Sequence, residues 1–221
     1  MPTPPIVTVD VVLLTLRQPG LECALLRRDR EPFLGRWALP GGWIHPERDR
    51  DAEAAARRIL RDKAGLQSPY LEQLQTFSGA ERDPRGWSLS VAYYALVPAA
   101  LVDAPRDDLR WSAADEVRGL PFDHRAILQT ALDRLRSKTS YSSLPTHLMP
   151  RSFTLGQLQA VYEQILQTTL DKRGFRRRIE DLDILEQEPG ATLSVGGRPA
   201  QLYRVRRRAA AHGVALAQRA L

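Results

Sequence analysis

The stretch from Leu39 to Leu66, LPGGWIHPERDRDAEAAARRILRDKAGL, restricts the possible folds of this chain more than any other part of it. It opens with a Gly-Gly turn, continues into an Ala- and Arg-rich segment from Asp51 to Ala64, and ends at Gly65. A glycine just after a run of good helix formers is typical of a helix C-terminus. We therefore expect a tight loop that leads into a helix, an arrangement common in phosphate-binding sites.

The segments on either side of this loop and helix alternate between strand and helix patterns. β-branched and apolar residues predict strands over residues 7–16, 21–28, 70–78 and 88–98. Residues 109–117 predict a further strand followed by a short helical turn. Residues 123–138 have apolar side chains at the spacing of a helix, namely Ile127, Leu128, Ala131, Leu132 and Leu135. Strands with a helix on each side predict an α/β/α sandwich.

The C-terminal part follows a different pattern. Thr154 is placed to cap a helix, Asp171 to cap a second, basic helix, and residues 185–205 predict a two-stranded hairpin. Helix, turn, basic helix and hairpin is the order of a winged helix-turn-helix. We therefore predict a first domain over residues 1–140, a linker over 141–152 and a winged helix-turn-helix domain over 153–221.

The positive charge is concentrated in this second part. The chain has a net charge of +6, with 12 Lys and Arg against 7 Asp and Glu from Arg151 onward, and 20 against 19 before it. A basic module joined to a nearly neutral domain indicates a nucleic-acid partner. The residues that we expect to contact DNA lie on the second helix and at the hairpin tip: Lys172, Arg173, Arg176, Arg177, Arg178 and Arg198. A solvated basic face on a small dimerisation module is the alternative.

Cysteine content and the start of the chain indicate the compartment. Cys23 is the only cysteine, so no internal disulfide can form and a reducing cytosol is the natural setting. The first residues, MPTPPIVTVD, lack the pattern of a signal peptide, and no segment has the apolar length of a membrane span. We expect a cytoplasmic protein with no membrane partner.

The stretch from Leu39 to Leu66 resembles the Nudix box, whose pattern is G-x5-E-x7-R-E-U-x-E-E-x-G-U with U an apolar residue. Nudix enzymes hydrolyse nucleoside diphosphates linked to another group, and carboxylates on one face of the box helix hold their Mg²⁺. Aligned on Gly65 and Leu66, the pattern places its arginine at Arg58 and its three helix carboxylates at Ile59, Asp62 and Lys63.

This box departs from the pattern at the positions that carry the chemistry. Asp62 alone keeps a carboxylate, and Lys63 places a positive charge where a metal ion needs a negative one. The loop between Gly42 and Arg58 has two extra residues, which puts Arg50 in register with the loop glutamate of the pattern. We therefore expect no catalytic residue and no metal site, in a pocket that binds a nucleotide without cleaving it.

We assign ligand binding to residues that belong to the box or carry groups suited to phosphates and bases: Arg27, Arg36, Trp37, Gly41, Gly42, Arg58, Asp62 and Arg82. Trp43 and Trp87 are alternatives for stacking on a base. For each arginine or tryptophan taken singly, a role on the surface or in the core explains the residue equally well. His45 and His124 have no paired metal-ligand spacing and are expected to be solvated or hydrogen-bonded.

Over nearly its whole length the chain resembles the Nudix-related transcriptional regulators of NAD metabolism, the NrtR family. GRWALPGGWI, RDPRG, VAYYALVP and PFDH resemble the sensor half, and FTLGQLQAVYEQIL, LDKRGFRRRI and GRPAQLYRV the DNA-binding half. The resemblance implies a homodimeric repressor of NAD-related genes that binds double-stranded operator DNA and is released by ADP-ribose or a related nucleotide. It implies no required cofactor, with Mg²⁺ needed only for hydrolysis. Gly174 stands where we expect a polar residue such as Asn, so base preference is expected to differ from that of relatives.

Two other functions stay open. The first is an active, Mg-dependent Nudix hydrolase of the ADP-ribose pyrophosphatase type with a C-terminal regulatory or dimerisation domain. It needs metal ligands from outside the box, such as Glu47, Asp49, Asp51 or Glu53. The second is a tail that binds another protein and has no DNA role. DNA binding measured with and without ADP-ribose separates the three.

Overall fold

The structure is a computed structural model, and it describes residues 4–68, 70–102, 106–195 and 198–206. The chain forms two compact units. The first comprises Met1–Val97 and Leu101–Arg134, and the second comprises Pro98–Ala100 and Leu135–Leu221. Each unit has a sheet and a hydrophobic core of its own.

The first unit is built on a mixed sheet. The strands are β1 (Ile6–Arg17), β2 (Gly20–Arg27), β3 (Trp37–Ala38), β4 (Gly41–Trp43), β5 (Tyr70–Gly79), β6 (Ser88–Leu96) and β7 (Leu109–Ala113). The order is β3-β2-β1-β6-β5, with β4 paired to β1 and β7 to β2. β1 and β6 run parallel, and the other pairs are antiparallel. The predicted strands are confirmed, whereas the short β3 and β4 fall in a segment predicted as loop.

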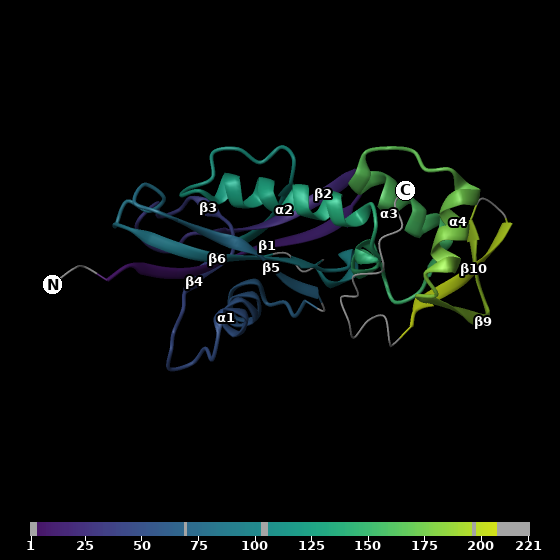
Figure 1. Ribbon diagram of the computed structural model, residues 1–221, viewed down its shortest axis with the longest axis horizontal. Coiled ribbons are helices and arrows are strands. Elements are labelled where there is room, and N and C mark those ends of the chain that lie inside the picture. The colour runs from purple at the N-terminus through teal and green to yellow at the C-terminus, as the bar shows by residue number, and fades with distance from the viewer. Residues whose placement is uncertain (1–3, 69, 103–105, 196–197, 207–221) are drawn as a thin grey trace. The chain divides into compact units, whose positions relative to one another are not determined.

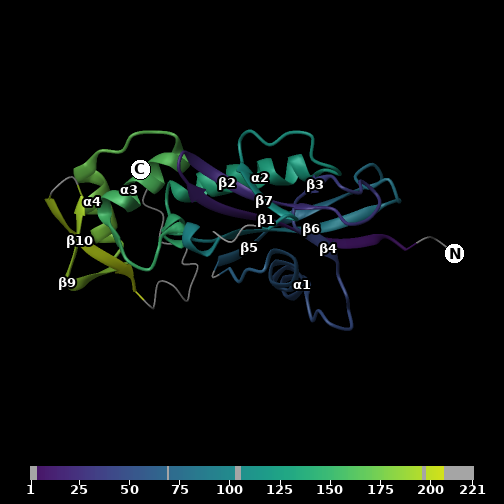
Figure 2. The ribbon, with the colours of Figure 1, turned by 180° about the vertical axis from the view of Figure 1, so that it is seen from behind.

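Helices cover both faces of this sheet. α1 (Ala52–Ile59) continues into the π-helical turn η1 (Leu60–Ala64) on one face, and α2 (His124–Thr139) lies on the other (Figures 1 and 2). A short 3₁₀ helix, η2 (Ala99–Leu101), precedes β7. The buried core on the α1 side joins apolar residues of the helix to those of the central strands, among them Val9, Val11, Leu13, Ala56, Ile59 and Leu60. The predicted α/β/α sandwich is therefore confirmed.

Local sequence explains the ends of the box helix. The Asp51 side chain accepts a hydrogen bond from the backbone N–H of Ala54, at 2.7 Å, and so caps the first turn of α1. At the other end Gly65 has φ +68°, in the left-handed region where glycine bears no steric penalty. This turn lets the backbone N–H of Leu66 bond to the carbonyl of Leu60 at 3.2 Å. The predicted helix over residues 51–64 is confirmed, with a π-helical final turn.

The second unit has the order of a winged helix. Its elements are η3 (Leu144–Leu148), β8 (Phe153–Thr154), α3 (Leu155–Leu166), α4 (Lys172–Asp181), β9 (Leu185–Val195) and β10 (Arg198–Val205), with sheet order β8-β10-β9. Thr154 forms a capping box with Gln157, and Asp171 accepts from the backbone N–H of Gly174 at 2.7 Å. Both predicted caps are confirmed. The segment predicted as a linker contains η3, in which Leu144, Pro145 and Leu148 are buried.

The turn between α3 and α4 is fixed by one carboxylate. Glu163 Oε1 accepts hydrogen bonds from the backbone N–H of Leu170 and from Gln159 Nε2, both at 2.9 Å. Gln159 Nε2 also donates to the Leu170 carbonyl at 2.9 Å. Tyr162 of α3 packs edge-on against Phe175 of α4, with ring centroids 5.3 Å apart. These contacts set the angle between the two helices.

No helix within the described part of the chain is both long enough and apolar enough to span a membrane.

Candidate functional site: a cation-rich pocket and a basic helix

A pocket of about 250 Å³ opens in the first unit, at the side of the sheet where the Gly-Gly turn meets the box helix. β1, β4, η1, the loop after β2, the loop after β5 and the start of α2 all contribute to it. Nine charged side chains line it: Asp10, Arg28, Asp29, Arg30, Arg58, Lys63, Arg82, Asp83 and Arg85. The other lining residues are Thr8, Leu39, Gly41, Gly42, Trp43, His45, Phe122 and His124. Among the charged side chains, the six Arg and Lys residues outnumber the three Asp residues.

One wall of the pocket is held by a bidentate ion pair between α1 and the loop before it. Arg58 Nε and Nη2 donate to the two carboxylate oxygens of Asp49, both at 2.7 Å, and Nη2 also donates to the Trp43 carbonyl at 3.0 Å. Asp49 accepts a further bond from the backbone N–H of His45 at 2.8 Å. These bonds anchor the longer loop of this box. The hydrogen bonds from Arg58 lower the pKa of Asp49 to about 2.

Substitution of Asp49 by asparagine should therefore destabilise the first unit in a pH-dependent way. We expect Asp49→Asn to lower the free energy of unfolding by about 2 kcal/mol at pH 7, the value of a hydrogen bond to a charged group. Because the folded pKa is lowered, the contribution of the carboxylate is complete above its ordinary pKa of about 4 and is lost as the pH falls toward about 2. Urea unfolding followed by tryptophan fluorescence measures it, since Trp37, Trp43, Trp87 and Trp111 all lie in this unit. A difference that stays constant between pH 5 and pH 2 would contradict this role.

A buried carboxylate lies directly behind Gly41, the first residue of β4. Asp10 of β1 accepts a hydrogen bond from Ser90 Oγ at 2.7 Å, and its other oxygen is 3.4 Å from His124 Nε2. The backbone N–H of Leu39 donates to His124 Nδ1 at 3.1 Å, which leaves Nε2 to face Asp10. Burial raises the pKa of Asp10, but His124, Ser90 and Arg82 more than offset it, so the pKa is lowered. Asp10 is thus an anion at neutral pH, fixed against the turn.

Gly41 and Gly42 offer a matched test of this close approach. A Cβ on Gly41 would lie 2.0 Å from Asp10 Oδ1, whereas the nearest atoms to a Cβ on Gly42 would be Lys63 Nζ at 3.4 Å and Ile59 Cδ1 at 3.6 Å. We expect Gly41→Ala to lower the free energy of unfolding by about 2 kcal/mol and Gly42→Ala by less than about 1 kcal/mol, because only the first overpacks the wall. Tryptophan-monitored urea unfolding measures both. Equal losses for the two variants would show that Asp10 can move aside freely.

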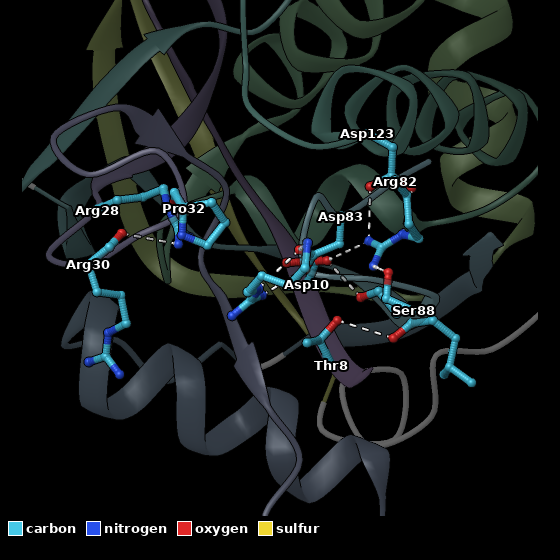
Figure 3. Close-up of polar contacts among 12 residues, drawn as sticks. Thr8, Asp10, Arg28, Arg30, Pro32, Arg82, Asp83, Ser88 and Asp123 are labelled. Carbon is cyan, nitrogen blue, oxygen red and sulfur yellow. Dashed lines mark hydrogen bonds and ion pairs between the residues drawn. The ribbon is translucent and has the colours of Figure 1, made fainter. Parts of the chain in front are cut away.

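Arg82 lines the pocket, but its guanidinium is already held from several sides (Figure 3). Nε and Nη2 donate to the carboxylate of Asp123 at 3.0 and 2.9 Å, Nη1 donates to Ser88 Oγ at 3.1 Å, and Nη2 lies 3.5 Å from Asp10. Its side chain is 7% exposed. This arginine joins β1, β6 and the start of α2, and its donors are engaged within the protein.

Of the eight residues assigned to ligand binding from the sequence, four line the pocket: Gly41, Gly42, Arg58 and Arg82. The other four lie outside it. Arg27 is exposed at the end of β2, Arg36 donates to the Gly119 carbonyl, Trp37 packs against the Arg110 guanidinium at 4.5 Å, and Asp62 pairs with Arg61. Their assignment to a ligand stays a prediction.

Several pocket residues were not assigned to a ligand from the sequence. Arg28 and Arg30 lie in the loop after β2, and Arg85 lies in the loop after β5, far away in the sequence. Lys63 was considered only because it replaces a metal ligand of the Nudix pattern. Trp43, named as an alternative, lines the pocket with 45% of its surface exposed, and the Arg85 guanidinium lies 5.5 Å from its ring. His45 and His124 both line it as well. Gly41 and Gly42, which lie beside the Lys63 ammonium group in the structure, were the sequence signal that could have drawn attention to Lys63.

The side chains at the metal positions of the Nudix pattern do not fit a magnesium site. Ile59 is fully buried in the core, and Asp62 is exposed and paired with Arg61 at 3.0 Å. Lys63 Nζ donates to the Gly41 carbonyl at 2.6 Å. Within the described ranges no three or more His, Cys, Asp or Glu side chains converge on one point. The carboxylates named as alternative metal ligands for a hydrolase already have partners in the protein. Asp49, Asp51 and Glu53 are engaged by Arg58, the Ala54 N–H and Arg57, and Glu47 lies 3.5 Å from His45 Nδ1.

In the second unit the basic helix α4 presents its cations to solvent. Phe175 and Ile179 are buried, whereas the side chains on the opposite face are exposed: Lys172, Arg173, Arg176 and Arg177. Arg178, which we also assigned to DNA, is half-buried and donates to the Ser140 carbonyl, so it stabilises this unit from within. The backbone of Arg198 begins β10, opposite Val195, and its side chain lies outside the described residues.

Comparisons with known proteins match both units. The NUDIX domain family matches residues 4–135, and the family described as the NrtR DNA-binding winged helix domain matches residues 145–205. The ADPR responsive transcriptional repressor NtrR of Acinetobacter baylyi is 40% identical over 205 residues, which cover 90% of this chain and 82% of that protein.

Solved structures agree with this match. Shewanella oneidensis NrtR complexed with a 27mer DNA has 36% identity and a TM-score of 0.87, over 93% of this chain and 96% of that one. The NUDIX domain of the same protein complexed with ADP ribose has 37% identity and a TM-score of 0.55, over 60% of this chain and 90% of that one. With a Nudix domain followed by an NrtR-type DNA-binding winged helix, the chain belongs to the NrtR family.

Proposed function

We propose that this protein is a DNA-binding transcriptional repressor of NAD-related genes, that ADP-ribose is its effector, and that its Nudix domain senses this nucleotide without hydrolysing it. The observation that carries the DNA-binding part is the exposed row of Lys172, Arg173, Arg176 and Arg177 on α4, with Phe175 and Ile179 buried beneath it. A helix with this face, followed by a hairpin, suits the major groove and its flanking phosphates. The names of the similar repressor and of the solved complexes support the two partners.

The proposal that the Nudix domain does not hydrolyse its ligand is supported by the side chains at the metal positions of the Nudix pattern. Ile59 belongs to the core, and Lys63 brings an ammonium group to the Gly41 carbonyl. A hydrolase of this kind requires a divalent ion to neutralise the diphosphate and polarise the bond that breaks. The pocket keeps cations suited to holding a diphosphate, and its described residues include no cluster of three or more carboxylate, His or Cys side chains that could hold a metal ion.

Regulation follows from linkage. If ADP-ribose binds better to a form of the protein that holds operator DNA poorly, it must weaken DNA binding by the same factor by which DNA weakens ADP-ribose binding. We propose a cytoplasmic homodimer as the active form, because two recognition helices related by two-fold symmetry match the two half-sites of a palindromic operator. Sedimentation equilibrium of the purified chain tests the dimer directly.

An electrophoretic mobility shift with DNA from upstream of the gene's own operon tests the function as a whole. We expect a complex that unrelated DNA of equal length does not compete away, that ADP-ribose dissociates, and that AMP leaves intact. The affinity should fall steeply with salt because several arginines displace counterions from phosphates. Equal binding to both DNAs would refute the repressor, and turnover of ADP-ribose with Mg²⁺ at ordinary enzyme rates would refute the silent domain.

A further inference from the structure

The cations of the Nudix pocket differ in how their charge is compensated. Six cationic side chains line it: Arg28, Arg30, Arg58, Lys63, Arg82 and Arg85. Four of them form ion pairs with carboxylates, in the pairs Arg30–Asp29, Arg58–Asp49, Arg82–Asp123 and Arg85–Asp83. Within the described residues, Arg28 and Lys63 are the two that have no carboxylate partner at salt-bridge distance.

Both of these cations donate instead to backbone carbonyls. Arg28, which Figure 3 shows beside Pro32, donates from Nε to the Pro32 carbonyl at 2.7 Å. Its guanidinium lies 4.9 Å from the Phe122 ring. Lys63 Nζ donates to the Gly41 carbonyl at 2.6 Å. A carbonyl satisfies one N–H of an ammonium group but does not neutralise its charge, and two further N–H groups remain on Nζ. The pocket thus holds positive charge that its own carboxylates do not compensate.

The surroundings of Lys63 make this charge costly for the protein alone. Partial desolvation and the positive charges of Arg30 and Arg28 lower the pKa of Lys63, although Asp29 and Asp10 act in the opposite sense. Its side chain is nevertheless accessible at the open side of the pocket. An anion that enters the pocket would relieve the repulsion among these cations, and so would bind more tightly than to a lysine on a free surface.

The position of Lys63 indicates which anion. Lys63 occupies the box position at which the Nudix pattern has a glutamate for Mg²⁺, and its ammonium group reaches the carbonyl of the turn that the pattern places beside the metal-binding helix. In a metal-dependent pocket the glutamate, the ion and the diphosphate form a chain of alternating charge. Here Lys63 supplies the positive charge from the helix itself, so neutralising the diphosphate needs neither the glutamate nor the metal ion.

We infer that Lys63 is a built-in cation that binds the diphosphate of the nucleotide effector directly, so that effector binding requires no divalent metal. This inference rests on the proposed function, because it assigns a residue to the sensing of ADP-ribose. It goes beyond it in stating how the diphosphate is neutralised. Arg28, the second uncompensated cation, acts beside it.

Isothermal titration calorimetry on the full-length protein tests the inference, with ADP-ribose, ADP and adenosine each titrated in Mg²⁺ and in EDTA. The variants are Lys63→Gln, Lys63→Arg and, as a control, Arg57→Gln. The control removes one positive charge from an exposed residue of α1 that pairs with Glu53 and lies outside the pocket. Tryptophan-monitored unfolding of each variant shows whether Lys63 merely holds the Gly41 turn in place.

We expect the wild-type affinity for ADP-ribose to differ by less than about threefold between Mg²⁺ and EDTA. Lys63→Gln should weaken ADP-ribose and ADP by at least about tenfold in both conditions, as for the loss of a charge-assisted hydrogen bond. Adenosine should be unaffected because it has no phosphate. Lys63→Arg should restore most of the affinity, and Arg57→Gln should change none of it.

A wild-type protein that binds ADP-ribose only with Mg²⁺ would overturn the inference, as would Lys63→Gln binding as tightly as wild type. A Lys63→Gln variant that loses stability and loses affinity equally for adenosine and ADP would also overturn it, in favour of a structural role. If the wild type binds ADP but not ADP-ribose, without metal and through Lys63, the inference stands and the proposed effector fails. If it binds none of the three ligands, both fail.

Discussion

Simultaneous replacement of Arg173, Arg176 and Arg177 by alanine is expected to weaken operator binding by at least about 100-fold at moderate salt. These three side chains are exposed on α4 and are not needed for its packing, since Phe175 and Ile179 hold the helix in place. The variant should therefore fold normally and lose only its attraction to DNA. Fluorescence anisotropy with a labelled operator measures the affinity. The dependence of log affinity on log salt should become shallower by about one for each phosphate that the variant no longer neutralises.

A matched control removes the same charge elsewhere. Arg48, Arg50 and Arg57 are exposed in the first unit, so their triple replacement by alanine lowers the net charge equally without touching α4. This control should bind the operator within about threefold of wild type, because none of the three arginines belongs to the winged helix. If both triple variants lost affinity alike, the attraction would come from net charge alone, and α4 would not be the reading helix.

Restoring a glutamate of the Nudix pattern at position 59 is expected to destabilise the first unit strongly and not to restore hydrolysis. Substitution of Ile59 by glutamate restores the residue of the Nudix pattern, but Ile59 is fully buried and its Cδ1 atom lies under Gly42. We expect Ile59→Glu to lower the free energy of unfolding by about 3 kcal/mol or more, because apolar packing is lost and a carboxylate is taken out of water. We expect no hydrolysis of ADP-ribose in Mg²⁺. Tryptophan-monitored urea unfolding and chromatographic detection of AMP formed from ADP-ribose provide the two readouts.

Ile59→Leu is the control that separates volume from charge, and it should cost less than about 1.5 kcal/mol. The decisive contrary result would be an Ile59→Glu protein that keeps its stability and hydrolyses ADP-ribose with Mg²⁺. That outcome would mean that the position still faces the pocket and that a single residue silences the domain. It would leave the role of α4 untouched.

Features set by neighbours in the sequence were predictable. The helix caps at Thr154 and Asp171 and the turn at Gly65 depend on a few adjacent residues, and the structure has all three as expected. The cap at Asp51 depends on equally local contacts. The strand pattern and the hairpin of the second unit follow from the same local signals. The family and its two-domain order were likewise visible, because the box and the tail motifs are continuous in the sequence.

The pocket was less predictable because loop positions and distant pairs decide which side chains enter it. Arg27 was assigned to the ligand, yet the pocket is lined by its neighbour Arg28, the first residue of the loop after β2. Arg82 was expected to meet a phosphate, but a carboxylate 41 residues further along the chain, Asp123, engages it. Arg178 similarly bonds to Ser140, 38 residues away. No local pattern specifies such partners.

The bonds of Glu163 in the turn between α3 and α4 separate the folding of the second unit from its choice of DNA. They fix the helix angle through the Leu170 backbone and the Gln159 side chain, none of which lies on the exposed face of α4. New side chains on that outer face could therefore appear one at a time while the scaffold stayed intact. Gly174 is exposed on α4 and has no side chain, and a Cβ added there would lie 3.3 Å from the capping oxygen Asp171 Oδ2. Related proteins could therefore change the DNA sequence that they recognise without changing their fold, and one fold could come to regulate different sets of genes.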